Sequence, residues 1–85
     1  MSNIAFDRDF IEKLVLDQVT DLGVASDAVK LTAQLDGLGL DSLDIVELSQ
    51  QVRRELGISL SAKDFAETVT VNDVVEVIVD RAGTA

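Results

Sequence analysis

The sequence contains no cysteine, no histidine and no proline, and its only aromatic residues are three phenylalanines. Without cysteine there are no disulfides, no thiolate chemistry and none of the usual zinc sites, which is compatible with a reducing compartment. Without histidine nothing titrates near neutral pH at its ordinary pKa, so ready acid–base catalysis and a His-assisted serine nucleophile are excluded. With so few aromatic residues, aliphatic side chains must fill the core.

Long apolar runs are also missing. None exceeds three residues, so the sequence predicts no membrane span. Residues 1–7 lack the basic start and apolar stretch of a secretory signal. The net charge of −9 predicts a surface that repels nucleic acid and anionic membranes and attracts basic protein patches. We therefore expect a cytoplasmic protein with protein partners.

The chain length of 85 residues, 47% of them hydrophobic, suits one small domain with a single core. No internal repeat, low-complexity tract or linker interrupts the sequence, so we expect residues 1–85 to form a single domain. Apolar residues spaced by three and four predict helices over residues 7–22 and 41–56. The first apolar stripe comprises Phe10, Ile11, Leu14, Val15, Val19 and Leu22. The second comprises Ile45, Leu48, Val52 and Leu56, and Gly57 ends that helix.

The pattern weakens between these helices, over residues 24–40. A structureless connection of this length is unusual in a compact domain. We expect its leucines to hold it against the core; they are Leu31, Leu35 and Leu38. Gly37 and Gly39 are expected to give the backbone freedom just before the second helix.

Two further helices are predicted in the last third of the chain. Ser61 and Asp64 have the spacing of a capping box, which predicts a short third helix with Phe65 and Ala66 facing inward.

Thr70 is the expected cap of a fourth helix over residues 71–81. Its apolar face comprises Val71, Val74, Val75 and Ile78. Val75, Val77 and Val79 also alternate as in a strand, but the cap and the lack of a partner strand favour a helix. The predicted fold class is therefore all-α: a small four-helix bundle with a long first loop and a short third helix.

The candidate functional residue is Ser42, at the start of the second helix, within the run LGLDSL at residues 38–43. Asp41 already supplies a good helix cap, so the Ser42 hydroxyl has no evident structural role. Hydrolytic chemistry is disfavoured because the pattern Gly-x-Ser-x-Gly is absent around Ser42 and Asp41 would be a weak base. Phosphorylation is disfavoured by the neighbouring Asp41 and Asp44. Covalent attachment of an anionic group fits better, because a phosphodiester is stabilised by the N–H groups and dipole of a helix start.

A calcium loop was weighed as an alternative for the same segment. Asp36 and Glu47 are spaced like its first and last ligands. However, Leu38 and Leu40 stand at ligand positions, and Asp41 stands where such a loop needs glycine. The sequence therefore predicts no metal site.

The run at residues 38–43 resembles the Leu-Gly-x-Asp-Ser-Leu signature of acyl carrier proteins, and the resemblance continues to the end of the chain. It implies that a phosphopantetheinyl transferase moves phosphopantetheine from coenzyme A to Ser42. The terminal thiol then carries acyl intermediates as thioesters between partner enzymes of fatty-acid, specialised-lipid or polyketide biosynthesis. On this reading the chain is a free-standing, monomeric carrier rather than an enzyme.

The resemblance also assigns roles to residues around the second helix. The positions that meet basic patches of partner enzymes are Asp41, Leu43, Asp44, Val46 and Glu47. The positions near which the bundle can open to shelter an acyl chain are Ile45, Val52, Leu56 and Phe65. Leu43 and Val46 lie outside the core stripe, which independently favours a docking surface. Isolated exposed apolar residues, or burial under the long loop, are the alternatives.

One feature departs from the family pattern. Fatty-acid carriers continue acidic toward the end of the second helix, whereas this chain has Arg53 and Arg54. These residues place docking to fatty-acid synthase enzymes in doubt and favour a partner with a mixed-charge patch. An aminoacyl or peptidyl carrier is the alternative within carriers, but it usually shows Gly-Gly-x-Ser, so Leu40 and Asp41 favour acyl cargo. An unmodified helical interaction module is the alternative outside them.

Overall fold

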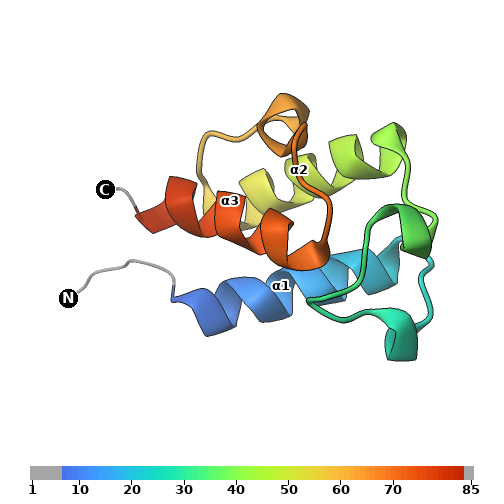
Figure 1. Cartoon of the computed structure of the whole chain (residues 1–85). Coiled ribbons are helices and arrows are strands. Elements are labelled where there is room, and N and C mark those ends of the chain that lie inside the picture. The colour runs from blue at the N-terminus through green and yellow to red at the C-terminus, as the bar shows by residue number, and fades with distance from the viewer. Residues whose placement is uncertain (1–6, 84–85) are drawn as a thin grey trace.

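The computed structural model describes residues 7–83, and within that range all regular structure is helical. The three α-helices are α1 (Arg8–Asp21), α2 (Ser42–Leu56) and α3 (Val71–Gly83). Three 3₁₀ turns accompany them: η1 (Ser26–Ala28), η2 (Asp36–Leu38) and η3 (Ala62–Phe65). In Figure 1, α1 packs against both α2 and α3, and η3 joins α2 to α3. The expectation that residues 1–7 do not form a secretory signal falls almost entirely outside the described range.

The helix ends follow the predicted caps closely. The Asp7 side chain accepts a hydrogen bond from the Phe10 N–H at 2.9 Å and so begins α1. Gly57 ends α2 in the left-handed conformation, with φ +67°. Helices were predicted over 7–22 and 41–56, so both predictions are correct to within one residue at each end.

The all-helical fold class is confirmed, but a count of four helices is not. The expected third helix is η3, a 3₁₀ turn of four residues. Its capping contact forms, since Asp64 Oδ2 accepts from the Ser61 N–H at 2.8 Å. The turn does not continue, because the N–H groups of Val69 and Thr70 donate to the Asp73 carboxylate instead, at 2.9 and 3.1 Å. Phe65 faces inward as predicted, whereas the same prediction for Ala66 is wrong, because Ala66 is exposed.

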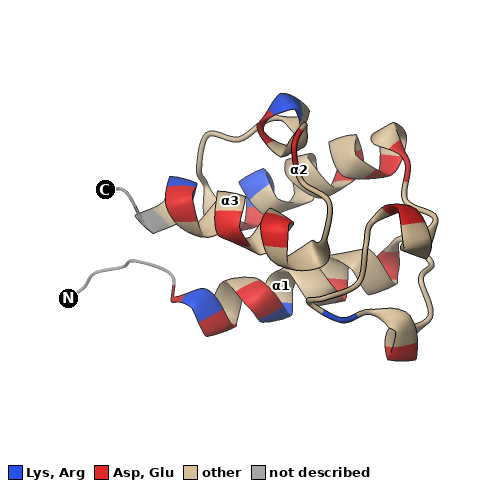
Figure 2. Ribbon diagram, viewed as in Figure 1, with Lys and Arg blue, Asp and Glu red and all other residues tan. Residues whose placement is uncertain are grey.

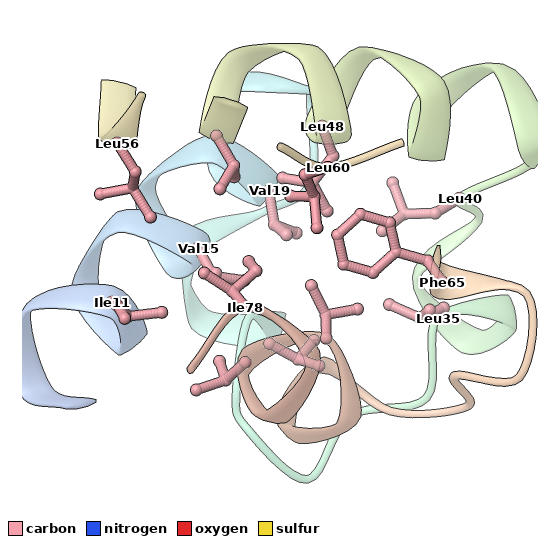
Figure 3. Packing of buried hydrophobic residues seen from close by; sticks show 14 residues of the cluster. Ile11, Val15, Val19, Leu35, Leu40, Leu48, Leu56, Leu60, Phe65 and Ile78 are labelled. Atoms are coloured by element: carbon pink, nitrogen blue, oxygen red, sulfur yellow. The ribbon is translucent and has the colours of Figure 1, made fainter. Parts of the chain in front are cut away.

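A single aliphatic core lies between the helices (Figure 3). Residues 71–83 are helical, which excludes the strand alternative. The predicted apolar face of α3 is fully buried; its residues are Val71, Val74, Val75 and Ile78. In α1 the buried line is Ile11, Val15 and Val19. Phe10 was predicted to share that face, but it is 50% exposed. Phe10 precedes Ile11 by one residue and therefore points about 100° away from it.

The long connection between α1 and α2 is anchored both by burial and by its backbone. Leu35 and Leu40 are buried in the core, while Leu31 and Leu38 are partly buried. Three backbone hydrogen bonds, which we call the loop–α3 pairing, join this connection to the start of α3. They are Leu35 N to Val69 O at 2.8 Å, Val71 N to Ala33 O at 3.0 Å and Asn72 N to Leu31 O at 2.8 Å. This pairing explains how a long connection remains ordered with little helix of its own.

Arg8 links the two helices that pack most extensively. Its guanidinium contacts Glu12 of α1 at 2.9 Å, and Glu76 and Asn72 of α3 at 2.8 and 2.7 Å. The hydrogen bonds to Glu12 and Glu76 raise the pKa of Arg8 above its ordinary value. No helix within residues 7–83 has the length and apolarity needed to cross a bilayer.

Candidate functional site

Ser42 is the first residue of α2, and its hydroxyl is left unused by the helix start. Asp41 and Asp44 form a reciprocal capping box, in which each carboxylate accepts from the backbone N–H of the other residue at 3.1 Å. Ser42 is exposed, and its hydroxyl has no hydrogen-bond partner within residues 7–83. The sequence predicted this division of roles, in which Asp41 caps the helix and Ser42 remains available.

The path of the backbone just before Ser42 depends on one glycine, Gly39, rather than on two. Gly39 follows η2 with φ +79°, a conformation that residues with a side chain rarely adopt. Gly37 has no such backbone angle, so the expectation that it too frees the chain is wrong. Leu40 is buried and its N–H donates to the Leu35 carbonyl at 3.2 Å, which fixes the chain just before Ser42.

A depression of about 260 Å³ opens beside Ser42. It is lined by Gln34, Leu35, Asp36, Leu40, Asp41, Ser42, Ile45, Phe65, Thr68 and Val69. Figure 3 shows the Phe65 ring beside Leu40 and Leu35 at this end of the core. Of the four predicted acyl-pocket residues, Ile45 and Phe65 therefore lie next to Ser42. Val52 and Leu56 are buried farther along α2 and do not line the depression.

The predicted docking residues divide by exposure. Leu43 is 74% exposed, and Asp41 and Glu47 are also exposed. Val46 is partly buried, and Asp44 is partly buried with its carboxylate held in the capping box.

Sequence reasoning missed a groove of about 380 Å³ between α1 and α2. Its lining is Gln18, Asp21, Leu22, Glu47, Leu48, Gln51 and Glu55. Glu47 thus faces this groove as well as the outer side of α2. The only indication of this groove in the sequence is the pair of polar residues near the end of α1, Gln18 and Asp21.

Charge is distributed unevenly along α2 (Figure 2). Asp44 and Glu47 lie in its first half, near Ser42, whereas its last turn carries Arg53 and Arg54 together with Glu55. A carboxylate also stabilises the start of η3, where Asp64 accepts from the Ser61 N–H. Hydrogen bonding from the Ser61 backbone, together with Arg81, lowers the pKa of Asp64 below its ordinary value, so Asp64 is ionised at neutral pH.

The residues of the site suit covalent modification by another protein rather than catalysis. The Asp41 and Asp44 carboxylates each accept a backbone hydrogen bond of the capping box, and the chain has no histidine to activate a serine. No group of three potential metal ligands comes together within residues 7–83. What remains is an accessible hydroxyl at a helix start, which suits modification by another protein.

Comparison with known proteins agrees with this arrangement. The family model of the phosphopantetheine attachment site matches residues 15–78, from within α1 to within α3. The acyl carrier protein of Campylobacter hominis is 38% identical over 61 residues, covering 71% of this chain and 77% of the relative. That of Nitratidesulfovibrio vulgaris strain DP4 is 31% identical over 72 residues, covering 84% and 91%.

Larger proteins also match. The non-reducing polyketide synthase tazA of Aspergillus terreus is 36% identical over 66 residues, covering 76% of this chain, and the orsellinic acid synthase of Beauveria bassiana is 38% identical over 63 residues, covering 73%. The chain spans only 3% of the length of each synthase.

The chain belongs to the acyl carrier protein family, whose members are phosphopantetheine-dependent carriers rather than catalysts. Such carriers interact with phosphopantetheinyl transferases and with biosynthetic enzymes. The residues present fit the phosphopantetheine group. Ser42 offers an exposed hydroxyl with no hydrogen-bond partner in the described chain, and the start of α2 favours the negative charge of a phosphodiester.

Proposed function

We propose that phosphopantetheine is attached to Ser42. The single observation that carries this proposal is the exposed Ser42 hydroxyl at the start of α2, which the Asp41–Asp44 capping box leaves unused. Bound there, the group supplies a thiol that carries acyl cargo as a thioester. Because the neighbouring carboxylates accept backbone hydrogen bonds and the chain has no histidine, the transferase must accept the Ser42 proton.

Partner enzymes are proposed to dock on the outer side of α2 around Ser42. The proposed contact residues are Asp41, Leu43, Asp44, Val46 and Glu47. The exposure of Leu43 supports an apolar contact at this surface, since 74% of a leucine is left in water. The carboxylates around it favour basic patches on the enzymes.

The cargo is proposed to be an acyl chain sheltered between α2 and the η3–α3 region. Ile45 and Phe65 would meet it first, because they line the depression beside Ser42. Val52 and Leu56 are buried in the core beyond this point, and an opening of the bundle would bring them into contact with a longer chain.

The pathway is proposed to be fatty-acid, specialised-lipid or polyketide biosynthesis. Relatives of both kinds support this range, since acyl carrier proteins and polyketide synthases match the same chain. We further propose that residues 1–85 act as a single, monomeric carrier domain in which η3 takes the place of the short third helix of a four-helix bundle. The absence of cysteine is compatible with the reducing cytoplasm, where we propose that the protein works.

Intact-mass measurement tests the attachment site. The chain is incubated with coenzyme A, magnesium and a broad-specificity phosphopantetheinyl transferase. We expect one added phosphopantetheine on the wild type and none on Ser42→Ala. Ser61→Ala is the matched control, because Ser61 is also exposed and also lies at the start of a helical turn. It should be modified like the wild type.

The outcome separates the carrier from its alternatives. An unchanged mass on folded wild-type protein, with an active control carrier in the same assay, would contradict the proposal and favour an unmodified interaction module. Modification followed by loading with amino acids rather than acyl groups would instead identify an aminoacyl carrier.

A further inference from the structure

The outer side of α2 carries its arginines in line with Ser42 and Leu43. Eleven residues make about three helical turns, so Arg53 stands on the same side of α2 as Ser42. By the same spacing Arg54 stands on the same side as Leu43, the most exposed large apolar side chain among the described residues. The two arginines lie about 16 Å farther along the helix axis.

Neither arginine forms an ion pair within residues 7–83. Arg53 and Arg54 are exposed, and the ion pairs within residues 7–83 involve only Arg8 and Arg81 as cations. The arginines do face the negative end of the helix dipole. That interaction stabilises the helix end without occupying the guanidinium groups, which remain able to bind an external anion.

Glu47 completes the pattern on this side of the helix. It follows Leu43 by four residues and precedes Arg54 by seven, which places Leu43, Glu47 and Arg54 along one stripe. The stripe thus runs from an exposed apolar residue through an acid to a base. In a chain of net charge −9, with only 7 basic residues, Arg54 on this stripe and Arg53 beside it make the outer side of the last turn positive. The acid of that turn, Glu55, lines the groove between α1 and α2.

We propose that Arg53 and Arg54 are specificity-determining residues of the docking surface. The partner they fit is an enzyme with basic groups opposite the Ser42 end of α2 and acidic groups opposite its last turn. A uniformly basic docking patch meets two like charges there and binds weakly. This inference rests on the proposed function, because it requires that enzymes dock on α2 to reach a group on Ser42.

The test measures binding of the loaded carrier to a probe enzyme. The probe is a fatty-acid ketosynthase whose docking patch is basic throughout. Wild type and Arg53→Glu/Arg54→Glu are first loaded with phosphopantetheine and checked by intact mass, and their Kd values are then measured by calorimetry. We expect the double variant to bind about tenfold more tightly than the wild type, because two repulsive contacts become attractive.

A charge swap on the enzyme tests the complementary half of the inference. In a ketosynthase variant with glutamates at the far edge of its patch, the order of affinities should reverse, with the wild type binding more tightly. Lys13→Glu/Lys30→Glu is the matched control: both lysines are exposed, lie outside α2, and give the same change in net charge. Its affinity for either ketosynthase should stay within about threefold of the wild type.

Each outcome is decisive. If the control gains as much affinity as the arginine variant, total charge governs binding and the inference is wrong. It is also wrong if all loaded forms bind both ketosynthases equally. Should the glutamate variant not fold, Arg53→Gln/Arg54→Gln takes its place, with an expected gain of about threefold. Failure of the wild type to become loaded would instead contradict the proposed function.

Discussion

At the start of α2, two adjacent polar side chains have different tasks. Asp41 makes the helix cap with its carboxylate, and its partner Asp44 closes the reciprocal bond. Ser42 is therefore spared a capping role, although serine is a common cap elsewhere. Its hydroxyl stays exposed in a helix whose start is already satisfied, which makes it suitable for a covalent group.

Gly39 provides the sharpest prediction for a single residue. An added Cβ would meet no atom within 4 Å, so Gly39→Ala tests only the backbone, which has φ +79°. We expect unfolding free energy to fall by about 1–2 kcal/mol, the cost of a left-handed conformation in an L-residue. Urea unfolding measures this change.

Gly37→Ala is the matched control for Gly39→Ala. Its φ is not in the left-handed region, and an added Cβ would lie 4.0 Å from the Gln34 Cβ, an ordinary contact. We expect a change between zero and a gain of about 1 kcal/mol, because alanine restricts the unfolded chain. Equal losses at the two glycines would contradict the assignment of Gly39 as the strained position.

Among the elements, α3 begins with a carboxylate that accepts two backbone hydrogen bonds. Asp73 Oδ2 accepts from the N–H of Val69 at 2.9 Å and of Thr70 at 3.1 Å, and the Thr70 hydroxyl accepts from the Asp73 N–H at 3.1 Å. The bonds from Val69 and Thr70 lower the pKa of Asp73 below its ordinary value.

This lowered pKa predicts a pH dependence for the stability of the fold. The folded pKa of Asp73 lies below the unfolded value of about 3.9, so its stabilisation is complete above that value and is lost as pH falls through the folded pKa. Asp73→Asn should lower the free energy of unfolding at pH 7. Its difference from the wild-type value should become smaller as pH falls from about 5 to about 2. Urea unfolding over this range measures the difference. If the difference in unfolding free energy stays constant over this range, the shape of the Asp73 side chain rather than its charge stabilises the start of α3.

Helix ends were predictable because their causes are local. Asp7, Asp41, Gly57 and Thr70 act on backbone groups within a few residues, so sequence alone placed the ends of α1 and α2 to within one residue and the start of α3 correctly. The extent of η3 was not predictable from its capping pattern. It depends on the N–H groups of Val69 and Thr70, which donate to the Asp73 carboxylate instead of continuing the turn.

In the candidate site, too, local features could be predicted from the sequence and features made by distant segments could not. The exposed Ser42 and its capping neighbour Asp41 followed from the motif and the helix pattern. The depression beside Ser42 did not, because Gln34 and Thr68 come from segments that only the loop–α3 pairing brings together. Neither residue belongs to an apolar stripe or to a motif, so the sequence gives no signal for it.

At the scale of the whole molecule, Phe65 joins the site to the core. It is 3% exposed and lines the depression beside Ser42. We expect Phe65→Ala to lower the unfolding free energy by about 3–5 kcal/mol, a large share of the stability of a small domain. Phe65→Leu should cost only about 1 kcal/mol, because it keeps most of the volume. Urea unfolding compares the two variants.

The leucine variant also separates packing from recognition. Because Phe65→Leu leaves Ser42 and the outer side of α2 unchanged, its rate of phosphopantetheine transfer should match the wild type. A much slower transfer on folded protein would show that the transferase reads the depression itself.

The loop–α3 pairing has a consequence for the order of events during synthesis. Residues 31–35 find their backbone partners in residues 69–72, which leave the ribosome much later. The segment before Ser42 can be set only after the start of α3 has been translated and folded, since contacts between distant residues form last. A chain that ends before residue 69 therefore lacks the backbone partners that hold the segment preceding Ser42.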